Sequence, residues 1–164
     1  MRHKRPKLQP GQESVWDYPR PPAVESCKRR VRIVFDGEII AESTRALRVL
    51  ETSHPPTYYL PPEDVRTESF HPAGSSSVCE YKGRAIYFNL RSENRETACA
   101  CWCYPAPHSR YNLIKGYLAF YPSRVDACYL DDERVEAQAG DFYGGWISSE
   151  IVGPFKGAQG TSHW

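Results

Sequence analysis

The chain has 164 residues, of which 40% are hydrophobic and 13% aromatic, and its formal net charge is +1. A chain of this length and composition can bury the core of one domain without disulfide or metal cross-links. No apolar stretch approaches the roughly 20 residues that a membrane-spanning helix needs, so a membrane protein is not expected.

Positive charge is concentrated near the N-terminus. Residues 1–34 hold nine Lys or Arg against three Asp or Glu, whereas the remaining residues hold twelve against seventeen. The basic run over residues 1–7 is not followed by the aromatic and basic residues that would track a nucleic-acid strand. Charge runs of this kind are commonly solvated. We therefore expect a basic flexible tail over residues 1–15, a single β domain over residues 16–164, and no nucleic-acid partner.

The first residues also lack the apolar run of a targeting segment. We therefore expect a cytoplasmic protein, as a monomer or small homo-oligomer, in which the six cysteines remain thiols. The proline-rich residues 10–25 predict an extended arm. Trp16 and Tyr18 are expected to dock this arm, because an exposed Trp would leave a large apolar area in water.

Alternating and β-branched runs predict two hairpins. The first has the turn dipeptide Asp36-Gly37 between Val31–Phe35 and Glu38–Ala41. The second has Gly83 between residues 78–82 and 84–90. Further short strands are predicted over residues 97–104, 113–120, 125–130 and 134–137. Six to eight short strands of this kind predict an all-β fold of compact antiparallel sheets.

One short helix is predicted over residues 44–51. Ser43 or Thr44 can cap it, its apolar residues recur at helical spacing, and Pro55 prevents its extension. The segment that follows contains two Pro-Pro pairs, at residues 55–56 and 61–62. Residues before proline are pushed to extended angles, so these pairs predict a stiff rim.

The rim carries polar groups that could contact a ligand. His54 can act as a hydrogen-bond donor or general base beside Glu51 or Asp64, because loop carboxylates commonly fix an imidazole tautomer. It can equally cap the C-terminus of the predicted helix. Both interpretations stay open from the sequence.

Three cysteines recur at every second residue of a predicted strand, at Cys99, Cys101 and Cys103. Period-two alternation places them on one face, about 7 Å apart, which does not suit one tetrahedral metal. We therefore interpret them as small buried hydrophobic residues and expect neither metal nor cofactor. A zinc site completed by Cys79 or Cys128 is the alternative.

Four segments resemble, in their order and motifs, domain-of-unknown-function family 427. They are residues 35–65, CEYKGRAIYF (79–88), GYLAFYPSRVD (116–126) and residues 140–164. The resemblance covers nearly the whole chain from Trp16 onward and implies a mostly antiparallel domain similar to the β-tent architecture. It implies little about chemistry, because the family is functionally uncharacterised. Relatives of the β-tent often hold zinc through two Cys-x-x-Cys knuckles, which this sequence lacks.

The name of this family is associated with nucleotidyltransferases, which implies a Gly-Ser pair followed by paired acidic residues that hold Mg²⁺. Gly74-Ser75 supplies the first part, but the nearest acidic pair, Asp131-Asp132, lies far downstream in a predicted turn. No glycine-rich phosphate loop with a following Lys is present. Nucleotidyltransferase activity is therefore disfavoured.

The aromatic content points to a binding site. The chain has more Trp and Tyr than one core absorbs with their polar ends satisfied, and residues 140–157 combine aromatics with glycines. We predict a small-molecule-binding domain with an aromatic-lined pocket or tunnel between its sheets. The alternative is a small-substrate enzyme that uses Glu51 and His54 for acid–base chemistry, and a third hypothesis is an interaction module based on residues 1–7. The predicted ligand-binding residues are Trp16, Tyr18, Arg45, Glu51, Thr52, His54, Tyr58, Tyr87, Trp102, Tyr104, Tyr121 and Trp146.

Overall fold

Strands β3 (Val31–Phe35) and β4 (Glu38–Ser43) form the first predicted hairpin in the computed structural model, which describes residues 7–140 and 142–164. Asp36 and Gly37 have φ angles of +50° and +77°. A two-residue hairpin turn of type I′ requires a positive φ at both central residues. The Asp-Gly dipeptide therefore fixes the position of this hairpin.

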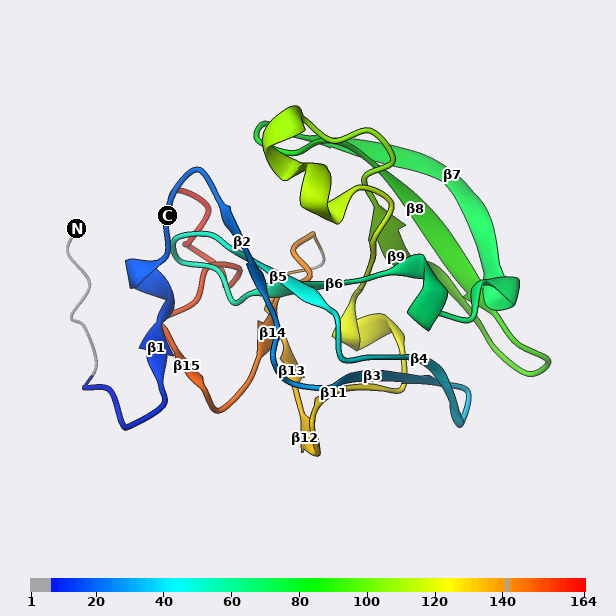
Figure 1. Cartoon of the computed structure of the whole chain (residues 1–164), viewed down its shortest axis with the longest axis horizontal. Coiled ribbons are helices and arrows are strands. Elements are labelled where there is room, and N and C mark those ends of the chain that lie inside the picture. The colour runs from blue at the N-terminus through cyan, green and yellow to red at the C-terminus, as the bar shows by residue number, and fades with distance from the viewer. Residues whose placement is uncertain (1–6, 141) are drawn as a thin grey trace.

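Two antiparallel sheets make up most of the fold, and they confirm the predicted all-β class. The larger has the strand order β2-β5-β6-β10-β9-β8-β7, and the smaller has the order β12-β11-β3-β4. Figure 1 shows β3, β4 and β11 along one side of the molecule and β7 and β8 on the opposite side. The remaining strands of the two sheets are β2 (Ala23–Ser26), β5 (Leu47–Leu50), β6 (Thr57–Leu60), β7 (Phe70–Cys79), β8 (Gly83–Arg91), β9 (Glu96–Cys103), β10 (Leu118–Phe120), β11 (Ala127–Leu130) and β12 (Glu133–Arg134).

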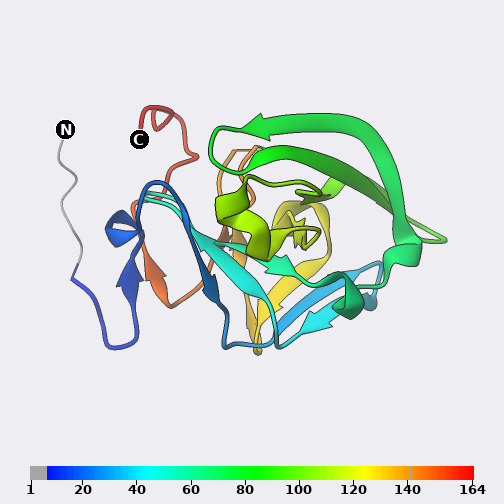
Figure 2. The same ribbon diagram turned by 45° about the horizontal axis from the view of Figure 1, so that its top comes forward.

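The second predicted hairpin, β7–β8, is longer than expected. Its first strand begins at Phe70 rather than near Val78, and its pairing is interrupted between Pro72 and Ser76. The Pro, Gly and Ser residues of this stretch have low strand propensity, which hid the strand from sequence analysis. Figure 2 shows the hairpin arching over the rest of the fold.

The prediction of a helix over residues 44–51 is wrong. Residues 47–50 instead form β5, which pairs with β2 on one side and β6 on the other. A helix of eight residues is marginal on its own, and two flanking strands satisfy the backbone of this segment more completely. The helices of the described residues are all short 3₁₀ turns, namely η1 (Val15–Asp17), η2 (Pro62–Asp64), η3 (Thr67–Ser69), η4 (Ser109–Ile114) and η5 (Pro122–Arg124). In the part of the chain that the structure describes, no helix has the length and apolar character to cross a membrane.

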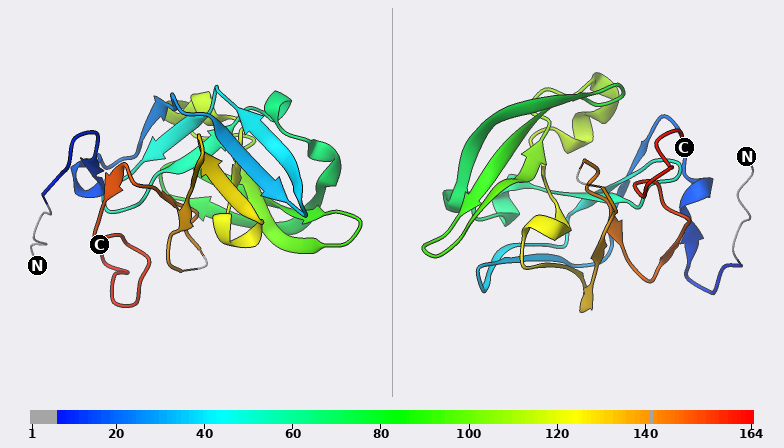
Figure 3. Two further views of the ribbon diagram at one scale, coloured as in Figure 1. Left: turned by 90° about the horizontal axis from the view of Figure 1, so that it is seen from below. Right: turned by 180° about the vertical axis from the view of Figure 1, so that it is seen from behind.

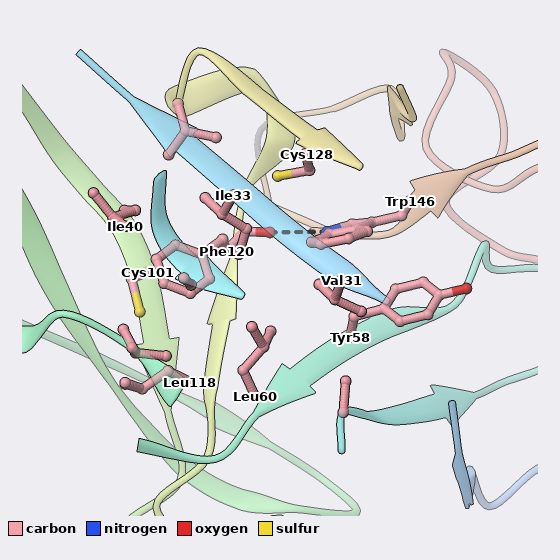
Figure 4. Packing of buried hydrophobic residues seen from close by; sticks show 14 of the residues in the cluster. Val31, Ile33, Ile40, Tyr58, Leu60, Cys101, Leu118, Phe120, Cys128 and Trp146 are labelled. Atoms are coloured by element: carbon pink, nitrogen blue, oxygen red, sulfur yellow. Dashed lines mark hydrogen bonds between the residues drawn. The ribbon is translucent and has the colours of Figure 1, made fainter. Parts of the chain in front are cut away.

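The main core lies between the two sheets (Figure 4). Tyr58 packs on Trp146 with ring centroids 4.8 Å apart, and the Trp146 indole N–H donates to the Phe120 carbonyl at 3.1 Å. Cys101 and Cys128 are fully buried in the same cluster. These side chains are therefore part of the packed core.

A second apolar cluster covers the opposite face of the larger sheet. Neighbouring residues on a strand point to opposite faces, so Tyr58 enters the main core while Tyr59 enters the second cluster. The same alternation sends Cys103 to the core and Trp102 to the second cluster. Tyr111 of η4 also packs there. The larger sheet is thus covered on both faces.

The N-terminal arm docks against the C-terminal region. Strand β1 (Glu13–Ser14) pairs in parallel with β15 (Ile151–Val152), so the ordered arm reaches back at least to Glu13. The Trp16 indole N–H donates to the Pro154 carbonyl at 2.7 Å, and Tyr18 is buried. Figures 1 and 3 show β1, in blue, beside β15, in orange, at one end of the molecule. The remaining pair is β13 (Glu136–Ala137) with β14 (Trp146–Ile147).

Candidate functional site

A cavity of about 300 Å³ lies on the second face of the larger sheet. Its walls come from the segment around β5 and β6, the closed end of the β7–β8 hairpin, β9, and the loops that follow β13 and β15. Val78 and Phe142 also line it and remain 70% and 64% exposed, so they mark its open side. The cavity therefore depends on segments from most of the chain.

Aromatic rings that contact one another form the inner wall. The Trp102 indole N–H donates to the Tyr59 hydroxyl at 3.2 Å, and the Trp102 ring lies 4.6 Å from the ring of Tyr121. The Tyr121 hydroxyl donates to the Phe142 carbonyl at 3.0 Å. Burial raises the pKa of Tyr59, Tyr104 and Tyr121, which keeps these phenols neutral. The wall is therefore apolar, fixed in position and uncharged.

Gln138 connects two polar groups at one end of the cavity. Its side-chain oxygen accepts from the Gly145 N–H at 3.1 Å, which identifies the other end of the amide as the NH₂ group. That NH₂ group donates to the Lys156 carbonyl at 2.7 Å and lies 3.1 Å from Nδ1 of His54. An amide NH₂ has no acceptor lone pair to offer, so Nδ1 of His54 must be the acceptor.

The proton of neutral His54 therefore sits on Nε2, which lies 3.5 Å from the Glu51 carboxylate. Burial lowers the pKa of His54 to about 4, and the positive charges of Lys156, Arg20 and Lys82 act in the same direction. The imidazole is thus neutral at pH 7. The predicted pair of Glu51 and His54 is brought together, but by a turn rather than at a helix end.

Two lysines carry positive charge at the cavity. Nζ of Lys82 lies 5.8 Å from the centroid of the Tyr104 ring, and Nζ of Lys156 lies 5.5 Å from that of Tyr143. Lys156 also donates to the Trp164 carbonyl at 3.3 Å. Cations over aromatic faces are favourable, so the rings help to keep both ammonium groups at the wall.

Six of the twelve predicted ligand-binding residues line this cavity: Glu51, His54, Tyr87, Trp102, Tyr104 and Tyr121. The other six do not. Tyr58 and Trp146 belong to the main core, Trp16 and Tyr18 dock the arm, the Thr52 hydroxyl donates to the Tyr18 carbonyl, and Arg45 pairs with Asp64 at 2.8 Å. Asp64 is thus engaged away from His54.

Sequence reasoning missed several residues of the cavity. Lys82 looked like a polar position of a hairpin, and Gln138 and Lys156 drew no attention because nothing local marks them. A signal existed for Tyr143 and Gly144, which lie in the stretch of glycines and aromatics that favoured a cavity.

The cysteine pattern is only partly as expected. Cys101 and Cys103 enter the main core, but the alternation breaks before them. Cys99 has a φ of +49°, its N–H donates to the Asn89 side chain, and the pairing of β8 with β9 shifts register at this point. Among residues 7–140 and 142–164, no three His, Cys, Asp or Glu side chains are grouped as metal ligands would be.

The residues considered for nucleotidyl transfer belong to different sheets. Gly74 and Ser75 lie on β7, whereas Asp131 lies in the turn between β11 and β12. Asp131 accepts from the Arg30 N–H and the Arg29 guanidinium, both at 3.0 Å, and these contacts lower its pKa. Asp131 thus has a structural role in its turn.

Comparison with known proteins gives one result for the chain. Residues 23–131, more than half of the chain, match the family described as "Domain of unknown function (DUF427)". No curated protein matches the chain. The matched segment contains every strand of the two main sheets except β12, and it ends before Gln138, Tyr143 and Lys156, so the loops that complete the cavity lie outside it. By this match, the chain belongs to the DUF427 family.

Proposed function

We propose that this protein binds a small organic molecule in the cavity beside β6 and β9. The observation that carries the proposal is the aromatic wall formed by Tyr59, Trp102 and Tyr121, which stands next to a polar end containing Glu51 and His54. Ligand sites typically combine predominantly apolar walls with a few fixed polar groups. A volume of about 300 Å³ suits a molecule of one or two rings.

The contacts of His54 support binding over acid–base catalysis. Nδ1 accepts from Gln138, and Nε2 faces Glu51, so both ring nitrogens have partners within the protein. A general base needs a free nitrogen within reach of the proton that it abstracts. We therefore assign His54 a positioning role in the polar end of the cavity and do not advance the enzyme alternative.

The proposal can be tested with three naphthalene derivatives of similar shape, a carboxamide, a carboxylate and a methylammonium compound. Isothermal calorimetry at pH 7.5 should show at least one of them binding with one-to-one stoichiometry and a Kd below about 1 mM, which corresponds to about 4 kcal/mol. Native mass spectrometry of protein purified without dialysis should reveal any ligand carried through purification.

A matched pair of variants locates the binding. Tyr87 lines the cavity, whereas Tyr129 is a half-buried tyrosine of β11 that packs against Arg32 elsewhere. Tyr87→Ala should weaken binding at least fivefold, and Tyr129→Ala should leave it unchanged. If none of the three compounds binds and native mass spectrometry shows no adduct, the proposed function is wrong.

A further inference from the structure

A lysine is turned toward the cavity from a position where lysines are normally solvated. Lys82 lies in the turn between β7 and β8, yet its side chain is half-buried and lines the cavity. Its carbonyl accepts from the His108 N–H at 2.9 Å, which anchors the turn. The next residue, Gly83, has a φ of +111°, a conformation that L side chains rarely adopt. The backbone therefore holds Lys82 in this position.

The charge of Lys82 has no close anionic partner among the described residues. Glu51 is the acidic residue whose charge acts on Lys82, but its carboxylate lies 3.7 Å from Arg20 and 3.5 Å from His54. No described carboxylate lies within 4 Å of Nζ of Lys82. Glu80 also lines the cavity but is exposed to solvent. The ammonium group therefore faces the cavity with the Tyr104 ring and the Cys79 thiol, and not a carboxylate, as its close neighbours.

An anion in the cavity would complete the surroundings of this charge. A charge removed from water is destabilising when it is not paired, and buried cations are normally found beside carboxylates. Burial lowers the pKa of Lys82, but interactions with Tyr59, Cys79 and Glu51 outweigh it, and the net pKa is raised. The group thus remains an ammonium ion at neutral pH and would be stabilised by an anion in the cavity.

Size and charge limit the anion. A cavity of about 300 Å³ is at the small end for ligand sites, which excludes a molecule as large as a nucleoside triphosphate. Glu51 also lines the cavity and would repel a ligand with several negative charges. Lys156, the second cation, already donates to a carbonyl. One negative charge is therefore the best match for Lys82.

We propose that the cavity selects a flat monoanion, of the class of aromatic or heteroaromatic carboxylates, whose carboxylate pairs with Lys82 while its ring packs against Trp102 and Tyr104. This inference rests on the proposed function, because it assigns the chemistry of the ligand in the same cavity. The aromatic faces hold any flat molecule, and Lys82 adds the preference for negative charge.

Two isosteric probes separate these contributions, naphthalene carboxylate and naphthalene carboxamide. Calorimetry at pH 7.5 should show that the wild-type protein binds the carboxylate at least tenfold more tightly than the carboxamide. Lys82→Met should weaken carboxylate binding at least tenfold and change carboxamide binding less than threefold. Lys82→Arg should retain most of the preference, and Lys115→Met, at an exposed position outside the cavity, should have no effect.

The possible outcomes distinguish the two proposals. Equal wild-type affinities for the two probes, or an equal loss of both in Lys82→Met, overturn the anion assignment and leave the binding function standing. Tighter binding of naphthyl phosphate than of the carboxylate overturns the choice of a monoanion. Failure of every probe, with no native adduct, overturns the binding function itself. The wild-type comparison decides the matter even if Lys82→Met does not fold.

Discussion

The imidazole of His54 joins parts of the chain that are distant in sequence. Gln138 lies 84 residues away and contacts Nδ1, while Glu51 lies one turn away and faces Nε2. These contacts fix the tautomer, and burial keeps the ring uncharged at neutral pH. The protonation of His54 therefore affects both the stability of the fold and the polar end of the cavity.

We expect the free energy of unfolding to fall as the pH falls from about 6.5 toward 4. Unfolded His54, with its ordinary pKa of 6.5, takes up a proton in this range, whereas folded His54 stays neutral until about pH 4, so protonation favours the unfolded state. The loss attributable to His54 should be about 1–3 kcal/mol. Urea denaturation at pH 7 and pH 5 measures it. His54→Gln should flatten this dependence, and His108→Gln, at an exposed position, should not. The same slope in wild type and His54→Gln would contradict the assignment.

Lys82 gives a second prediction for a single residue. In the absence of ligand, Lys82→Met should change the free energy of unfolding by less than about 1 kcal/mol, because methionine keeps the length of the side chain and the lost charge has no described carboxylate within 4 Å. Thermal unfolding of the unliganded protein tests this. Lys115→Met should leave the melting temperature unchanged. A larger fall in stability in Lys82→Met would indicate that this lysine serves the fold and not a ligand.

The residues of the site could be predicted only where local pattern marks them. Glu51 and His54 can be recognised because they lie three positions apart, next to the Pro55-Pro56 pair. The predicted ligand-binding residues include Tyr58 and not Tyr59, because period-two alternation does not tell which face borders a cavity. Gln138 and Lys82 reach the cavity through long-range contacts that leave no trace in the local sequence.

At the scale of elements, the sequence predicted structure where turn chemistry was specific. The Asp36-Gly37 turn located the β3–β4 hairpin, since both residues need positive φ. Strand β5 was mistaken for a helix, because its local apolar spacing fits both structures and only pairing with β2 and β6 decides between them. Tertiary contacts therefore set the identity of the shorter elements.

The loop between β13 and β14 gives a prediction at this scale. A Cβ at Gly144 would lie 2.2 Å from the Trp102 ring, so Gly144→Ala must displace the indole or the loop. We expect a loss of about 1–3 kcal/mol in stability and at least tenfold weaker binding of naphthalene carboxylate. Chemical denaturation and calorimetry measure the two effects.

Gly37, in the β3–β4 turn, provides the control for this substitution. It has a φ of +77° and no atom within 4 Å of an added Cβ, so Gly37→Ala introduces backbone strain of about 1–3 kcal/mol away from the cavity. Stability should fall while probe binding is retained. Retention of both indole position and binding in Gly144→Ala would show that the loop does not form the wall.

Apolar clusters cover both faces of the larger sheet, and this arrangement buries some of the thiols and leaves others partly exposed. Cys27, Cys101, Cys103 and Cys128 are buried, and burial raises the pKa of each, whereas Cys79 and Cys99 are partly exposed. Because the thiolate is the reactive form, the two groups should differ in reactivity.

We therefore expect two thiols of the native protein to react rapidly with a disulfide reagent, and all six to react in guanidinium chloride. Naphthalene carboxylate should slow only the thiol of Cys79, which lines the cavity. The variant Cys99→Ser isolates that reaction in a simple absorbance assay. Rapid reaction of four or more native thiols would contradict the burial pattern.

The parallel pairing of β1 with β15 sets an order of events during synthesis. Glu13 and Ser14 leave the ribosome early, but their partners Ile151 and Val152 follow more than 130 residues later. Contacts between residues so far apart close late in folding. Val15 and Tyr18, which are buried in the folded chain, therefore stay uncovered in the nascent chain until Ile151 and Val152 are made. Residues 138–156, which complete the cavity, are made in the same interval, so the nascent chain forms the cavity only when it also buries Val15 and Tyr18.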